Sequence, residues 1–168
     1  ADTFPNPHEK GLTPVQRDER DVLLSRLRNQ LFGLVDLDSY RTNPLAYIES
    51  IGLDAYIVRD YAPAAQRAAA VIATCKQLPA YLAQARANLG APMPRPWLDT
   101  ALLQTRGMAT FVDKDIRTQL PAAAPALDAC TAAFVEHTAW LEAQRAHATE
   151  AFALGTELER VLQLMQKY

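Results

Sequence analysis

The sequence lacks the features that mark membrane proteins and nucleic-acid-binding proteins. No apolar run approaches the roughly 20 residues that a helix needs to cross a bilayer. The 17 lysines and arginines are scattered, and the formal net charge is -2. This distribution offers no positive surface to a phosphate backbone. We therefore expect no integral membrane segment and no nucleic-acid partner.

Glycine and β-branched residues are also scarce, which argues against a β-sheet protein. Only 6 of the 168 residues are glycine, alanine is abundant, and the apolar fraction is 49%. Such a composition favours closely packed helices, and the length suits one ordinary domain. We predict a single all-α domain over residues 1–168, folded as an irregular bundle of about six or seven helices.

Residues for nucleophilic catalysis are few and badly spaced. The three serines lie outside any G-x-S-x-G turn, and the glycines form no phosphate-binding loop. Asp113 and Arg117 stand four residues apart, the usual spacing of a surface ion pair on a helix. We therefore predict no catalytic residue and no cofactor-binding residue in this chain.

Metal ligands are equally sparse. His8-Glu9 begins a zincin-like motif, but residue 12 is leucine where a second histidine would be needed. His137 and His147 are ten residues apart, so they do not share one turn of a helix. We interpret His137 as a hydrogen-bonded histidine at the edge of the core, and we predict no metal site in this chain.

The two cysteines, Cys75 and Cys130, each fall on the apolar side of a predicted helix. We interpret them as buried free thiols, because cysteine packs as a small hydrophobic residue. The alternative is a disulfide, which would require an oxidising compartment.

Proline marks the starts and stops of the predicted helices. Thr13-Pro14 combines an N-cap with proline in the first turn, and Asn43-Pro44 and Pro63 give similar starts. Pro79 should break or kink the alanine-rich helix that begins near Pro63. Beyond the Pro-rich connector, apolar spacing predicts a long antiparallel pair of helices over residues 97–120 and 126–147 at the centre of the bundle.

Specific residues are expected to hold this architecture together. We assign packing roles to Pro79, Trp97, Phe134 and Trp140.

Thr156 and Glu159 have the spacing of a capping box, so a last helix should begin there. That helix has no stop signal, which suggests that the chain is part of a longer protein. The polar, Pro-bearing start resembles either a processed or a trimmed N-terminus, and a removed signal peptide would place the protein in the periplasm or outside the cell.

The aromatic residues allow two interpretations. Such residues most often anchor helix packing and leave their polar tips in water. Alternatively, they could line a cleft beside Arg41, Arg59 and Arg67 that binds a small molecule or a carboxylate. The set comprises Tyr40, Tyr47, Tyr56, Tyr61, Tyr81, Trp97 and Trp140.

Ordered landmarks along the chain resemble one bacterial family, known as domain of unknown function 885. They begin with the Leu-rich first helix and continue with RTNPLAYIESI (residues 41–51) and LPAYLAQARANL with its PMPRPW continuation (residues 78–97). Next comes an A-x5-G-x3-F pattern from Ala101 through Gly107 to Phe111, and then ALGTELERVL (residues 153–162).

The resemblance implies a function that the motifs themselves do not carry. Members of the family are generally longer and look like metallopeptidases of the thermolysin-like superfamily. Their zinc motif, a His-Glu segment followed by Pro-Gly-His, lies in the C-terminal half and has no match here. The resemblance therefore implies a non-catalytic N-terminal helical domain that shapes or covers a substrate cleft. In zincins, a metal-activated water attacks the peptide carbonyl and a glutamate acts as general base.

The resemblance also implies partners. The chain would pack against the C-terminal remainder of its own parent, which would hold the zinc and act as a peptidase-like hydrolase on a peptide substrate. This chain alone would not be an enzyme. The alternative is a self-contained helical interaction or scaffold module without catalysis.

Overall fold

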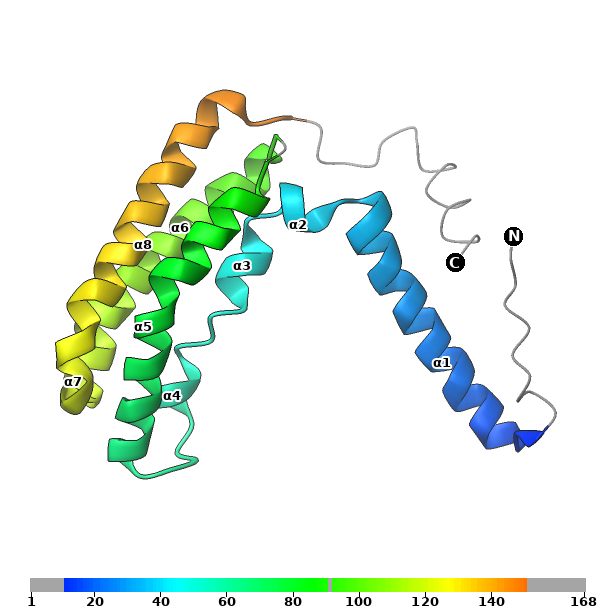
Figure 1. The fold of residues 1–168 in the computed structure, drawn as a ribbon, viewed down its shortest axis with the longest axis horizontal. Helices are drawn as coiled ribbons and strands as arrows, with labels where there is room; N and C mark the ends of the chain where they lie inside the picture. The colour runs from blue at the N-terminus through cyan, green and yellow to red at the C-terminus, as the bar shows by residue number, and fades with distance from the viewer. Residues whose placement is uncertain (1–10, 91, 151–168) are drawn as a thin grey trace. The chain divides into compact units, whose positions relative to one another are not determined.

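The structure, a computed structural model, describes residues 11–90 and 92–150. These residues are almost entirely helical and contain no β-strand (Figure 1). The predicted all-α class is therefore confirmed. The helices, in chain order, are α1 (Pro14–Leu31), α2 (Ser39–Thr42), α3 (Leu45–Glu49), α4 (Ala55–Val58), α5 (Ala64–Asn88), α6 (Arg95–Phe111), α7 (Arg117–Gln119) and α8 (Ala124–Gln144). The π-helical turns η2 (Phe32–Asp36) and η3 (Val112–Ile116) and the 3-10 turns η4 (Pro121–Ala123) and η5 (Arg145–His147) complete the described helical structure.

The first compact unit of the described residues covers 11–39 and consists of α1 with η2. Thr13 caps α1 as predicted, in a capping box with Gln16 and with proline in the first turn. At the other end, the Ser39 hydroxyl donates to the Gly33 carbonyl at 2.7 Å, and Asp38 takes a left-handed backbone conformation with φ 49°. Helix α1 contains no buried residue.

The second unit covers residues 40–150 and is a bundle built on α5, α6 and α8. Helix α8 packs along both α5 and α6, and Figure 1 shows that α6 runs antiparallel to its two neighbours. Helix α6 continues through η3 and α7 to Gln119, and η4 turns the chain back into α8. The predicted antiparallel pair at the centre of the bundle is confirmed.

Pro79 lies inside α5, so of the predicted break or kink at this position the break is wrong. Proline has no N–H and therefore cannot form the hydrogen bond to the carbonyl of Cys75. The flanking residues Leu78, Leu82 and Ala85 are all buried on one face of the helix. Burial of that face outweighs one missing hydrogen bond. Pro79 itself is exposed, so its predicted packing role is also wrong.

Cys75 on α5 and Cys130 on α8 form a disulfide, with Cα atoms 4.9 Å apart. The prediction that both side chains are buried is correct, but the interpretation as free thiols is wrong. The physical reason is that α5 and α8 pack side by side. Residues 55 positions apart in the sequence thereby come within bonding distance.

The core of the bundle is divided into two apolar clusters. The large cluster contains Ile48, Leu53, Ala68, Val71, Cys75, Leu78, Leu82, Val112, Ile116, Leu120, Ala123, Leu127, Cys130, Ala133 and Phe134. The small cluster contains Leu89, Met93, Leu98, Ala101, Leu102 and Leu141. Phe134 is fully buried, Trp140 packs against the small cluster and Trp97 is half-buried. The predicted cap at Thr156 and Glu159 lies outside the described residues.

Two buried polar residues lie between these clusters, and we call them the polar layer. Thr105 is on α6 between Leu102 and Val112, and its hydroxyl donates to the Ala101 carbonyl at 2.6 Å. His137 is on α8 between Phe134 and Leu141. The clusters are therefore interrupted at one level along both helices.

Candidate functional site

His137 is buried as a side chain without hydrogen bonds, in contrast to the predicted hydrogen-bonded histidine at the core edge. Its side chain is 0% exposed, and neither ring nitrogen has a hydrogen-bond partner. Burial lowers its pKa from 6.5 to about 4, and the positive charge of Arg86 contributes to the same shift. The ring is therefore neutral at physiological pH and is a core residue.

The residues considered as metal ligands do not come together. His147 is exposed at the end of η5, while His137 is in the polar layer. His8 and Glu9 lie outside the described residues. Among residues 11–90 and 92–150, no group of three or more His, Cys, Asp or Glu side chains is arranged to hold a metal ion. No helix in the same ranges is long and apolar enough to cross a membrane.

The arginines near the tyrosines do not form a carboxylate-binding cluster. Arg67 donates to the backbone carbonyls of Ala62 and Tyr56, at 2.9 and 3.0 Å, and forms an ion pair with Asp60. It therefore holds the entry to α5. Arg41 lies beside Gly90 instead.

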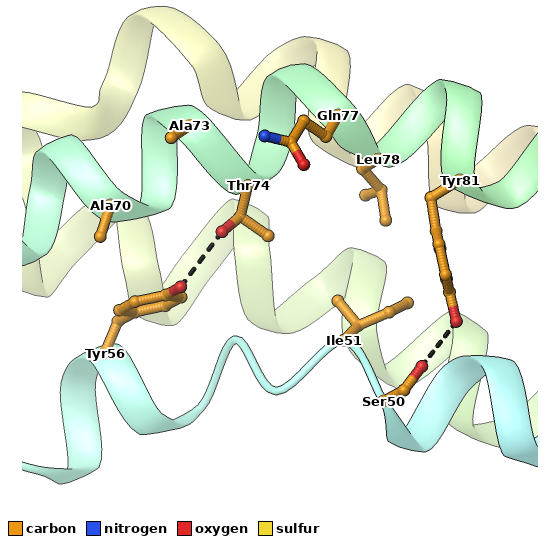
Figure 2. A pocket seen from close by; sticks show the side chains of 9 residues that line it. All are labelled: Ser50, Ile51, Tyr56, Ala70, Ala73, Thr74, Gln77, Leu78 and Tyr81. Carbon is orange, nitrogen blue, oxygen red and sulfur yellow. Dashed lines mark hydrogen bonds between the residues drawn. The ribbon is translucent and has the colours of Figure 1, made fainter.

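An open pocket of about 350 Å³ lies between the segment that joins α3 to α4 and one face of α5. Figure 2 shows Tyr56 and Tyr81 at its two ends, with Thr74, Leu78 and Ile51 between them. The lining residues are Ser50, Ile51, Tyr56, Ala70, Ala73, Thr74, Gln77, Leu78 and Tyr81. This volume is within the usual range of small-ligand sites.

Hydrogen bonds fix both tyrosines in place. The Tyr56 hydroxyl lies 3.1 Å from the Thr74 hydroxyl, and the Tyr81 hydroxyl lies 2.5 Å from the Ser50 hydroxyl (Figure 2). Tyr81 and Ser50 also approach the Tyr47 carbonyl, at 3.0 and 2.9 Å. Because two hydroxyl protons serve these three contacts, one contact lacks a proton at any instant. The ends of the pocket are therefore built from neutral groups that both donate and accept.

The residues that line this pocket offer contacts suited to binding and no group suited to catalysis. None of its lining residues carries a charge at neutral pH, and none is a base that could activate the Ser50 or Thr74 hydroxyl. Apolar surface from Ile51 and Leu78 and polar atoms from the hydroxyls and the Gln77 amide meet at one site. Such a lining suits an uncharged ligand with both apolar and hydrogen-bonding parts.

Sequence reasoning pointed to part of this pocket and missed its shape. Tyr56 and Tyr81 belong to the aromatic set, but no sequence motif drew attention to Ala70 or Ala73. Two small residues three positions apart on one helical face leave open space beside larger neighbours. That spacing was the available sequence signal.

The fold and the pocket define an all-α bundle protein with an open pocket, lined by uncharged residues, on one face of α5. Comparison with known families then places the chain in one of them. Residues 3–160 match the family described as bacterial protein of unknown function (DUF885), and the chain belongs to that family. No curated protein and no solved structure matches the chain.

Proposed function

We propose that this chain is the non-catalytic helical domain of a zinc-dependent peptidase-like hydrolase, in which it shapes the substrate cleft. Membership of the DUF885 family supports the proposal, because the landmark motifs resemble the helical half of such proteins. The described residues do not fit a zinc site. In this proposal the zinc motif lies outside this chain, as the family resemblance implies.

The observation that carries the proposal is the pocket on α5. It is open, has a volume of about 350 Å³ and lacks a charged side chain. It would bind an uncharged part of a peptide substrate and leave proton transfer and carbonyl polarisation to the catalytic part.

The disulfide supports an oxidising compartment for this domain. Disulfides such as Cys75–Cys130 persist in the periplasm and outside the cell, whereas thiols stay reduced in the cytosol. We therefore propose that the protein is periplasmic or secreted.

The test compares the 168-residue chain with the product of the complete natural reading frame. We expect zinc and peptide hydrolysis only in the longer product. Zinc content would be measured by metal analysis, and hydrolysis with a library of uncharged peptides. A natural product without zinc and without hydrolysis would overturn the proposal and leave the helical interaction module in its place.

Two variants, each with one alanine replaced by leucine, test the role of the pocket in the natural protein. Ala73 lines the pocket and Ala83 does not, and both are exposed residues of α5. We expect Ala73→Leu to raise KM without changing kcat, because it fills a binding site away from the reacting atoms. Ala83→Leu should leave both constants unchanged. Equal effects of the two variants would show that the pocket is not part of the substrate cleft.

A further inference from the structure

A second hollow, distinct from the pocket on α5, lies between the end of α3 and α6. Its volume is about 410 Å³, and it shares no lining residue with the first pocket. The residues that line it are Ile48, Glu49, Gly52, Asp54, Gln104, Gly107, Met108 and Phe111.

The walls of this hollow are apolar, and two glycines keep it open. Ile48 is buried, and Met108 and Phe111 pack against the large cluster. A Cβ atom added at Gly52 or Gly107 would meet nothing within 4 Å. Gly107 lies within α6, where glycine is less favourable than alanine. Gly107 forms no turn and no tight contact, and the missing side chain leaves open space beside α6.

Two carboxylates in the hollow lack counterions among the described residues. Glu49 and Asp54 are exposed and form no ion pair there. By contrast, Asp99 on α6 and Glu136 on α8 are each paired with an arginine. Asp54 precedes α4 in the N-cap position, yet its side chain makes no capping hydrogen bond. Both negative charges are therefore available to a ligand.

The side chain of Gln104 also lines the hollow. Its side-chain oxygen is buried and has no hydrogen-bond partner. That oxygen is covered by protein atoms, so the side chain forms part of the wall of the hollow and does not contact a ligand through its oxygen.

We propose that this hollow binds the basic side chain of a peptide, a lysine or an arginine. The apolar stem of such a side chain would lie against Met108 and Phe111, as long cationic side chains pack on apolar surfaces. Its charged head would face the carboxylates of Glu49 and Asp54. The proposal goes beyond the cleft-shaping function and stands without it, because it needs neither zinc nor hydrolysis.

The first experiment titrates the 168-residue chain with two probes that differ in one charge. They are Nα-acetyl-lysine methylamide and its neutral counterpart Nα-acetyl-norleucine methylamide, followed by NMR through the Gly52 and Gly107 amide signals. We expect the lysine probe to shift both signals, to bind at least about fivefold more tightly than the neutral probe, and to weaken as salt is added. Equal binding of the two probes, or no shift with either at millimolar concentration, would overturn the proposal.

Three variants locate the binding. Glu49→Gln combined with Asp54→Asn removes both charges at exposed positions and should weaken the lysine probe about tenfold. Asp115→Asn removes an exposed carboxylate that does not line the hollow, and it should leave binding unchanged. Gly107→Leu should block the hollow without unfolding α6, because leucine favours a helix and its Cβ would meet no atom within 4 Å. A loss of binding in Asp115→Asn equal to that in the double variant, or unaltered binding in folded Gly107→Leu, would contradict the site.

Discussion

The imidazole of His137 stacks on the indole of Trp140 one helical turn further along α8. Their ring centroids are 5.8 Å apart and their planes are inclined by 17°. His137 belongs to the polar layer, so a titratable ring without hydrogen bonds lies in the interior of the bundle. Its consequences for stability can be measured.

We expect acid to destabilise the bundle through His137. The unfolded chain binds a proton near pH 6.5, whereas the folded chain binds it only near pH 4. Between these values the unfolded state holds more protons. The free energy of unfolding should therefore fall by about 1.4 kcal/mol for each unit by which the pH is lowered. The contribution of neutral His137 to the free energy of unfolding is fully present above pH 6.5. Below pH 4 the total loss of free energy of unfolding should be about 3 kcal/mol. Urea unfolding at several pH values measures this dependence.

His137→Phe should abolish the contribution of His137 to the pH dependence. It should also raise the free energy of unfolding at pH 7 by about 1–2 kcal/mol, because it removes two buried nitrogens without partners and keeps an aromatic ring beside Trp140. His147→Gln, at an exposed position, is the matched control and should retain the dependence. An unchanged slope in His137→Phe would show that other groups cause the acid sensitivity.

Loss of the disulfide should lower the free energy of unfolding substantially. The bond closes a loop between residues 55 positions apart, which corresponds to about 4 kcal/mol in the chain-entropy model. Thermal unfolding of the oxidised chain, the reduced chain and the Cys75→Ala/Cys130→Ala variant measures the effect. Reductant should have no effect on the double variant. Two titratable thiols in protein purified from an oxidising compartment would contradict the bond.

Replacing Pro79 with alanine should stabilise the protein by about 1–2 kcal/mol. The alanine N–H can donate to the Cys75 carbonyl and complete the hydrogen bonds of α5, while the unfolded chain gains some freedom that offsets part of the benefit. Pro96 lies in the first turn of α6, where the missing N–H has no partner in any case. Pro96→Ala should therefore give no stabilisation. Equal effects of the two substitutions would mean that Pro79 does not interrupt the hydrogen bonding.

Removing the Tyr81 hydroxyl should cost about 1 kcal/mol. Tyr81→Phe loses the contacts with the Ser50 hydroxyl and the Tyr47 carbonyl that hold one end of the pocket. Tyr61→Phe is the control, because Tyr61 is exposed and its hydroxyl makes no hydrogen bond among the described residues. Chemical unfolding of both variants should separate them, and identical stabilities would show that the Tyr81 contacts contribute nothing.

The periodicity of apolar residues was sufficient to predict the buried faces of α5 and α8, but the Leu-rich α1 contains no buried residue. Leu127, Cys130, Phe134 and Leu141 recur at helical spacing on α8, and all four are buried. The same holds for Ala68, Val71 and Cys75 on α5. These predictions succeed because burial of an amphipathic face supplies most of the stability of a helix in a protein.

Predictions that depended on packing between helices were less successful. Local rules at Pro79 give the cost of one proline, and the burial of Leu78 and Leu82 that outweighs it appears only when α5 meets α8. The pairing of Cys75 with Cys130 has the same origin. The charge of Glu49 was visible in the sequence, but its position in the hollow beside Gln104 depends on the contact of α3 with α6.

The covalent link between α5 and α8 also determines how proteolysis of this protein would be seen. The connections on either side of α6, including η4 (Pro121–Ala123), lie between the two bonded cysteines. A protease that cut the chain there would produce two fragments that still migrate as one species on a gel without reductant. The cut would become visible only when the sample is reduced.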